Sequence, residues 1–213
     1  MYSVRPNLLM RKIYSSVVWR VHTKEKKVFL TFDDGPNPEV TPFVLSMLKS
    51  FNAKATFFCV GANIEKHPEV FQQLMAEGHS IGNHTYHHLN GWKTKTKEYL
   101  ENIEKCKTAM ANAHPPSTIH HPPFFRPPYG RMKPSQCSIL NTQYSVVMWD
   151  VLSGDFDEKT SEKKCLKNVL SKTREGSIVV FHDSIKAKKN LFYVLPKFLE
   201  HFSKKGFVFE RLQ

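Results

Sequence analysis

Two neighbouring carboxylates, Asp33 and Asp34, end an apolar run of β-type residues at 28–32 and are followed by Gly-Pro, a pair that breaks regular structure. Consecutive strand residues project to opposite sides, so the two carboxylates are expected to contact different neighbours. One of them could hold a metal ion while the other stands beside it as a base. The alternative is a turn in which the Asp side chains accept hydrogen bonds from local N–H groups.

Two imidazoles, His84 and His88, are the other candidate metal ligands. They stand four residues apart, so on a helical turn they would share one face and could bind one cation. The alternatives are a surface histidine run or buried histidines bonded to the backbone. Together with Asp34 they make two imidazoles and one carboxylate with a position left for water, which is typical of an open catalytic metal site. An iron oxygenase could use such a set, but the sequence lacks the His-x-Asp pair that a 2-oxoglutarate enzyme would need.

These residues need a scaffold that brings distant positions together. Strand-like and helix-like segments alternate about seven times, which predicts a parallel sheet wound through βα units. The predicted strands are 28–32, 55–60, 80–82, 124–126, 144–149, 177–181 and 207–212. The predicted helices are 38–51, 68–77, 95–111, 134–140, 161–172 and a last helix to about 205, with an irregular Pro-rich connection at 114–123.

Polar residues suited to chemistry follow these strands repeatedly. They are Asp33, Asp34, His84, Arg126, Asp155 and His182. Barrel enzymes build their sites at the C-terminal ends of strands, so the pattern predicts an α/β barrel fold with its site at that end. A Rossmann sheet is disfavoured because no Gly-x-Gly-x-x-Gly follows the first strand.

Length and charge limit the classes of protein further. A chain of 213 residues with 40% hydrophobic residues predicts one globular domain, without internal repeat or linker. The formal net charge of +12 would favour anionic partners. However, the lysines are spread over helix-like segments and accompany no nucleic-acid-binding module, so a solvated basic surface is expected and no nucleic-acid partner.

The cysteines and the N-terminal residues bear on the compartment. The four cysteines form no Cys-x-x-Cys pair and are expected to be reduced structural thiols. No apolar run is long enough for a transmembrane helix, and basic residues interrupt the first 20 positions, so the chain as written predicts a cytoplasmic protein, with association with the cell envelope as the alternative. Leu9, Ile13 and Val17 make a stripe at helical spacing, expected to pack on the domain, with peripheral membrane contact as the less favoured alternative.

Five motifs in order carry a resemblance that covers nearly the whole chain, from about Lys27 to Leu212. The motifs are Thr31-Phe-Asp-Asp-Gly-Pro36, His84-Thr-Tyr-His-His88, Arg126-Pro-Pro-Tyr-Gly130, Trp149-Asp-Val-Leu-Ser-Gly-Asp155 and Ile178-Val-Val-Phe-His-Asp183. With these motifs the sequence resembles the polysaccharide deacetylases, carbohydrate esterase family 4, whose catalytic unit is the NodB homology domain. The resemblance implies a distorted, incomplete (β/α) barrel of about seven parallel strands. It also implies a catalytic domain at 27–213, preceded by an extension at 1–26 that packs on it.

The resemblance implies a role for each motif residue. Asp34, His84 and His88 match the metal ligands, commonly of zinc, for which cobalt or nickel can substitute. Asp33 matches the general base, and Arg126 matches the arginine that holds this base and keeps it ionised.

The later motifs complete the implied set. Tyr129 matches the residue whose backbone N–H stabilises the oxyanion, with a plain wall as its alternative role. His182 matches the general acid, and Asp155 matches the carboxylate that orients it and raises its pKa. The resemblance also implies four residues that contact the substrate: Trp149, Phe156, Pro128 and Val180.

Two of these positions depart from the family pattern. The family usually has Trp at position 156 and often has Leu at position 180, where this chain has Phe and Val. Both positions shape the apolar wall around the acetyl methyl group, so acyl and sugar preference are less firmly implied than the chemistry. The resemblance implies a metal-dependent hydrolase that removes acetyl groups from N-acetylhexosamine units of an oligo- or polysaccharide. The alternatives are a deacylase of another amide or ester on a small amino-sugar conjugate, and a non-catalytic glycan-binding relic of the same fold.

Overall fold

A single parallel sheet organises the chain. The computed structural model describes residues 3–113 and 124–213, so the connection predicted at 114–123 lies outside the described residues. Seven strands follow one another in the order β5-β4-β3-β2-β1-β7-β6, β8 pairs with the start of β1, and each of these pairs is parallel. The strands are β1 (Lys27–Asp33), β2 (Thr56–Cys59), β3 (Ser80–Asn83), β4 (Phe124–Phe125), β5 (Ser145–Val146), β6 (Val151–Leu152), β7 (Ile178–His182) and β8 (Val208–Glu210).

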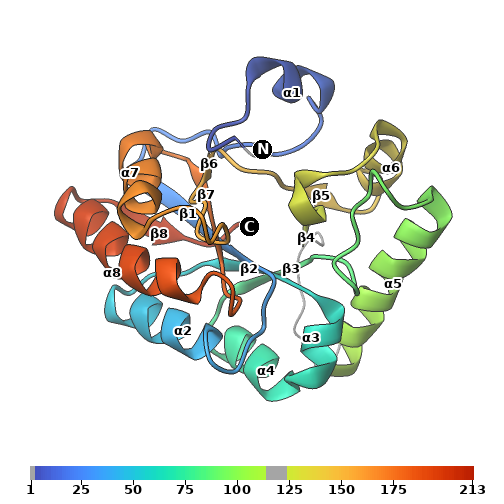
Figure 1. Ribbon diagram of the computed structural model, residues 1–213, viewed down its shortest axis with the longest axis horizontal. Coiled ribbons are helices and arrows are strands. Elements are labelled where there is room, and N and C mark those ends of the chain that lie inside the picture. Colours follow the sequence, from blue (N-terminus) through green and yellow to red (C-terminus); the bar gives the residue numbers. More distant parts are fainter. Residues whose placement is uncertain (1–2, 114–123) are drawn as a thin grey trace.

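Helices surround this sheet, and in Figure 1 they form a ring around the strands. They are α1 (Leu8–Ile13), α2 (Thr41–Ser50), α3 (Gly61–Lys66), α4 (Pro68–Ala76), α5 (Thr96–Ala113), α6 (Pro134–Leu140), α7 (Glu162–Lys172) and α8 (Lys188–Lys204), with a 3-10 turn, η2 (Pro128–Gly130). The predicted fold, an incomplete (β/α) barrel of about seven parallel strands, is confirmed.

The main core lies between the sheet and these helices. Phe32, Phe57 and Phe181 come from three adjacent strands and stack within 6 Å, with ring centroids 5.0 and 5.9 Å apart. Phe198 of α8 packs edge-on against Phe181. All four cysteines are buried and free, as predicted. No helix among the described residues is long and apolar enough to cross a membrane.

The prediction of one strand at 144–149 is wrong. β5 ends at Val146, and β6 begins at Val151 on the opposite edge of the sheet. Between them the Val147 N–H donates to Phe125 O at 2.8 Å, and the Asp150 N–H donates to Ile178 O at 3.0 Å. The chain therefore crosses from one edge of the incomplete barrel to the other within four residues. Such a short crossing has the apolar composition of a strand, which is why periodicity misassigned it.

Residues 3–20, which we call the N-terminal segment, lie against this crossing. The Val18 N–H donates to Val146 O, the Met148 N–H donates to Val18 O, and the Leu152 N–H donates to Val4 O, each at 2.8 Å. In Figure 1 this segment, with α1, spans the side of the ring between α7 and α6. The segment thus covers the gap between β5 and β6.

One buried carboxylate ties the N-terminal segment to the domain. Asp150 has no exposed surface, and it binds Arg11 at 2.7 Å and Arg5 at 3.2 Å. Arg174 lies 3.7 Å away, and the Ser177 hydroxyl donates to the same carboxylate at 2.7 Å. Burial raises the pKa of Asp150, but Ser177 and the arginines outweigh it, so the pKa lies below its ordinary value.

The expected packing of the Leu9, Ile13 and Val17 stripe is only partly correct. Val17 is buried, but Leu9 and Ile13 are 65% and 55% exposed. Instead, Met10 and Tyr14 contact the core cluster that holds Trp149. The short helix α1 is therefore attached to the domain by the Arg11 ion pair with Asp150 and by Met10, and not by the predicted stripe.

Candidate metal centre and active site

A cavity of about 750 Å³ lies at the C-terminal ends of the strands. Ten of the twelve predicted site residues line it: Asp33, Asp34, His84, His88, Arg126, Tyr129, Trp149, Phe156, Val180 and His182. The other two do not line it. Asp155 is buried behind His182. Pro128 is buried in η2, and the preceding residue, Pro127, lines the cavity instead. Strand ends that are far apart in the sequence therefore meet around one space.

The two adjacent aspartates contact different partners, as the strand geometry predicted. Asp33 is the last residue of β1, while Asp34 has a φ of 80°, in the left-handed region that non-glycine residues rarely adopt. This backbone is held on both sides. The Asn63 amide donates to Asp34 O at 2.7 Å, and the Gly35 N–H donates to Asp183 Oδ1 at 3.0 Å. Such strain persists only where the surroundings over-determine it.

Asp183 lies beside Gly35, next to the candidate metal ligands. It ends the fifth sequence motif, but the sequence analysis gave it no role. It is fully buried, and the Thr41 hydroxyl donates to it at 2.6 Å. Burial is the main cause that raises the pKa of Asp183 to about 7. A Cβ on Gly35 would lie 2.0 Å from this carboxylate, so only glycine fits at that position.

Asp34, His84 and His88 form the group that could hold a metal ion. Their nearest ligand atoms all lie within 4.8 Å of one another, with Asp34 Oδ1 3.2 Å from His88 Nε2 and 3.7 Å from His84 Nε2. Asp34 Oδ1 is buried, and no donor among the residues that the structure describes is bonded to it with good geometry. An unsatisfied buried carboxylate oxygen is costly, so its presence between two imidazoles indicates a cation site.

The backbone prepares His84 for this role. Its Nδ1 lies 2.7 Å from Arg126 O, and because a carbonyl only accepts, the Nδ1 carries the proton and the Nε2 lone pair faces Asp34. Burial lowers the pKa of His84 to about 4, so the imidazole is neutral at pH 7.

The predicted helical turn between the two histidines is wrong. Thr85 and His88 have φ values of 61° and 55°, so residues 84–88 form a loop, and the histidines converge through left-handed backbone instead. Their ring centroids lie 5.0 Å apart.

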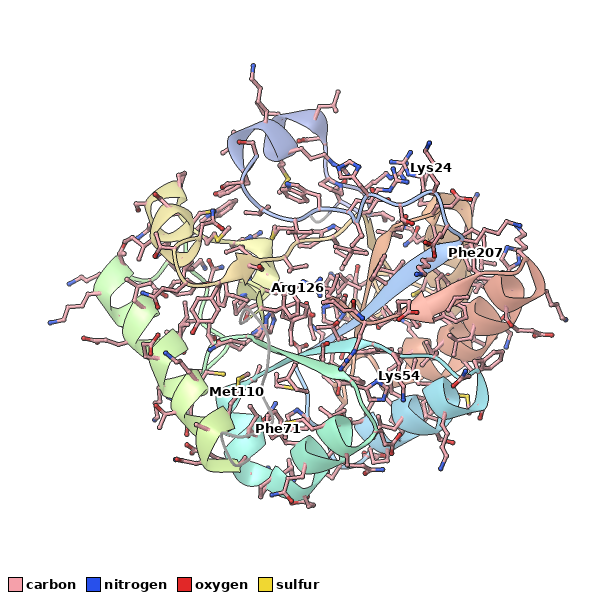
Figure 2. The ribbon with its side chains drawn as sticks, turned by 180° about the vertical axis from the view of Figure 1, so that it is seen from behind. Lys24, Lys54, Phe71, Met110, Arg126 and Phe207 are labelled. Atoms are coloured by element: carbon pink, nitrogen blue, oxygen red, sulfur yellow. The ribbon has the colours of Figure 1, made fainter. Side chains whose placement is uncertain are left out.

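Arg126 is buried at 1% exposure and fixes Asp33. Its Nη1 donates to Asp33 Oδ1 at 2.7 Å and to Thr31 Oγ1 at 2.8 Å, and its Nη2 donates to Met148 O at 2.8 Å. Figure 2 shows Arg126 near the middle of the molecule, among the strands. The guanidinium therefore holds one oxygen of Asp33 in a charge-assisted hydrogen bond and fixes the position of the carboxylate.

His182 ends β7 and is the register partner of Asp33 on the adjacent strand. Its ring Nδ1 lies 2.8 Å from Asp155 Oδ1, and its backbone N–H donates to Asp155 Oδ2 at 2.8 Å. Burial lowers the pKa of His182, but the charge and hydrogen bond of Asp155 outweigh it and raise the pKa to about 9. His182 is therefore protonated at pH 7 and held in one orientation.

Tyr129 stands at the rim of the cavity in a left-handed conformation, with a φ of 61°. Its ring is 59% exposed and lies 4.5 Å, between centroids, from His88. Within the described part of the chain no acceptor is bonded to the Tyr129 N–H. This N–H therefore remains available as a hydrogen-bond donor.

Sequence reasoning missed a second group of cavity residues. They are Ser3, Pro6, Asn7 and Met10 of the N-terminal segment, together with Trp92, Pro127, Gly130, Arg131, Leu152 and Lys186. None of them is a polar residue that directly follows a predicted strand, so the pattern used for the other residues could not identify them.

Comparisons with known proteins agree with this geometry. A family model described as polysaccharide deacetylase matches residues 20–144. A peptidoglycan-N-acetylglucosamine deacetylase of Bacillus cereus is 38% identical to this chain over 159 residues. The aligned region is 74% of this chain and 56% of the length of that relative. A chitooligosaccharide deacetylase of Azorhizobium caulinodans is 31% identical over 77% of each chain. A crystal structure of a peptidoglycan N-acetylglucosamine deacetylase, 32% identical, superposes with a TM-score of 0.85 over 97% of this chain and 94% of its own.

Proposed function

The chain belongs to the polysaccharide deacetylase family, and on that premise we propose that it is a metal-dependent hydrolase of the N-acetyl groups of N-acetylhexosamine units. The observation that supports the proposal is that Asp33 and His182 line one cavity together with the candidate cation site of Asp34, His84 and His88. Asp33 and His182 are register partners on β1 and β7, and Asp34 of the cation site directly follows Asp33. A protein that only bound glycans would need neither the base nor the acid.

The donor set fits a divalent transition ion. One carboxylate oxygen and two imidazole nitrogens are the ligands of an open zinc site, so zinc is the proposed ion, and cobalt or nickel can take its place. When bound, such an ion supplies a Lewis acid for the acetyl carbonyl and for the attacking water. The buried, unbonded oxygen of Asp34 supports this assignment.

Residues of the chain carry the proton transfers. Arg126 binds one oxygen of Asp33, and in this proposal the other oxygen accepts the proton of the attacking water. The water oxygen bonds to the acetyl carbon, the carbonyl oxygen becomes an oxyanion, and we assign its stabilisation to the Tyr129 N–H.

His182 completes the reaction as the acid. Its proton goes to the sugar nitrogen as the carbon–nitrogen bond breaks, and the products are acetate and the free amine. Asp155 is fully buried and bonds both the ring and the backbone of His182, so it positions this acid and keeps it protonated. Phe156 lies 4.8 Å from the His182 ring, between centroids, and contributes with Val180 and Trp149 to the apolar wall.

The test is mass spectrometry of N-acetylated oligosaccharides incubated with zinc-loaded protein. We expect loss of single acetyl groups as acetate, with none in a matched sample of Asp33→Asn that has equal metal content. Exhaustive chelation should abolish the reaction, and added zinc or cobalt should restore it.

Three results would count against the proposal. Loss of ester-linked acyl groups alone, with all amides intact, would favour the alternative of an ester deacylase. No loss from any substrate at full metal occupancy would favour a glycan-binding relic. Activity that survives chelation would contradict metal dependence.

A further inference from the structure

Trp92 and Arg131 form a paired platform at the rim of the catalytic cavity. Both residues line the same cavity as Asp34 and His84, but they come from two separate loops. Trp92 is 53% exposed, an unusual position for an indole unless it meets a ligand. The chemistry proposed above uses neither residue.

The two loops are joined so that the platform is rigid. The Arg131 guanidinium carbon lies 5.2 Å from the centroid of the Trp92 ring, and the indole N–H donates to Met132 O at 2.9 Å. The Gly91 N–H donates to Arg131 O at 3.0 Å, and a Cβ on Gly91 would approach that oxygen to 2.7 Å. The stacked pair is therefore formed before any ligand arrives, which lowers the entropy cost of binding.

The charges around the platform favour an anion. The acidic residues that line the cavity, Asp33 and Asp34, contact Arg126 and the histidine pair. In contrast, Arg131 and Lys186 also line the cavity, and within residues 3–113 and 124–213 neither forms a salt bridge with an acidic residue. The net charge of +12 adds to this field.

We propose that Trp92 and Arg131 form a subsite for a sugar ring that carries a carboxylate, adjacent to the N-acetylated ring at the catalytic centre. An exposed indole packs against the apolar face of a sugar ring. A guanidinium stacked on an aromatic ring still presents its N–H edge, which suits a carboxylate. The inference rests on the proposed function, and it assigns a preference for acidic over neutral glycans of the same length.

The experiment measures binding, so that it does not depend on turnover. Calorimetry of zinc-loaded protein gives the Kd for an N-acetylated tetrasaccharide whose alternate rings carry an ether-linked lactyl carboxylate, and for the same compound with that group as a neutral amide. We expect the wild type to bind the acid about tenfold more tightly than the amide, a preference that 0.5 M salt reduces.

Variants assign the preference to the platform. Arg131→Gln should reduce the ratio of the two Kd values about tenfold, to near one, whereas Lys66→Gln, which removes the same charge from an exposed position of α3, should preserve it. Trp92→Leu should weaken binding of both compounds by a similar factor of about five, because stacking does not depend on the charge. A second pair of compounds, with the carboxylate of a hexuronic acid, distinguishes which carboxylate position the subsite accepts.

A wild-type ratio near one for both pairs, or a ratio that Arg131→Gln leaves in place, would overturn the inference. Deacetylation of the same compounds, followed in parallel, separates this failure from that of the proposed function. Turnover without an acid preference contradicts the subsite alone, and an acid preference without turnover contradicts the hydrolase alone.

Discussion

Asp33 and Asp150 are both buried aspartates that bind arginine, yet they differ in how many of their oxygens are occupied. Asp150 has Arg11 on Oδ1 and both Arg5 and Ser177 on Oδ2. Asp33 has Arg126 on Oδ1, and within the described residues no donor is bonded to its Oδ2. A carboxylate with both oxygens occupied joins segments of the chain, whereas one with an open oxygen on a cavity wall can accept a proton.

The arginines that bind these two aspartates differ in how far their side chains are exposed to water. The Arg126 side chain is 1% exposed and has further bonds to Thr31 and Met148, so it holds Asp33 in one position. Arg5 and Arg11 are 35% and 28% exposed, so water shares their charge and they act as tethers. Burial of the cation, and not the presence of an ion pair, distinguishes the site from the scaffold here.

The largest expected effect of this difference is on rate. Asp33→Asn removes the open oxygen's basicity, so kcat/KM for an N-acetylated oligosaccharide should fall roughly 10²-fold to 10⁴-fold, the usual range for loss of a general base. Metal content should stay near that of the wild type, because Asp34 and both histidines remain. Loss of metal in Asp33→Asn with retention in Asp34→Asn would show that the two carboxylates have the reverse roles.

Asp150→Asn should act on stability instead. It removes the charge that binds the N-terminal segment, so the free energy of unfolding should fall by about 2 kcal/mol, which lowers Tm by about 4–8 °C. Because the pKa of Asp150 is lowered by folding, this stabilisation is present above about pH 4, the ordinary carboxyl pKa, and is lost as the pH falls through the lowered value.

The measurement is thermal unfolding at pH 7, with Glu158→Gln as an exposed control that should stay within about 0.5 kcal/mol of the wild type. Well below its Tm, Asp150→Asn should keep kcat within about threefold. A loss of rate comparable with that of Asp33→Asn would remove the distinction between the two aspartates.

The smallest effect is expected at Asp155, whose two oxygens are both bonded to His182, the proposed acid. Asp155→Asn removes the charge that raises the pKa of His182, so the alkaline limb of the pH profile of kcat/KM should move to lower pH by roughly 1–3 units. Profiles are compared at equal metal occupancy. An alkaline limb that stays in place would mean that Asp155 only supports the turn at 153–155.

Local signals were sufficient for much of the fold. The helix Pro134–Leu140 has its predicted bounds, because Pro at the first position is a strong start signal. Apolar strands followed by polar residues placed five of the cavity residues, since parallel strands bring their C-terminal ends to one edge; these are Asp33, Asp34, His84, Arg126 and His182. The family resemblance was needed to select the apolar wall. By contrast, α3 follows β2 after a single residue and has no side-chain cap, so no local signal separated it from the strand.

The remaining features depend on contacts between distant segments. Nothing near Arg5 or Arg11 indicates that their partner is Asp150, and nothing near Trp92 indicates a stacked arginine 39 positions later. The loop at residues 84–88 converges through left-handed backbone that depends on its neighbours and not on residue spacing. Such features follow from the assembled barrel, so they could be found only in the structure.

The attachment of the N-terminal segment has a consequence for the order of events during synthesis. Arg11 and Asp150 are 139 residues apart, so the segment leaves the ribosome roughly 7–30 s before its anchor at about 5–20 residues per second. Likewise, Val18 and Val4 cannot form their backbone hydrogen bonds with Val146 and Leu152 until β5 and β6 have been made. The N-terminal segment is therefore made well before the residues on which it docks, and Met10, Tyr14 and Trp19 stay exposed until β5 and β6 have formed.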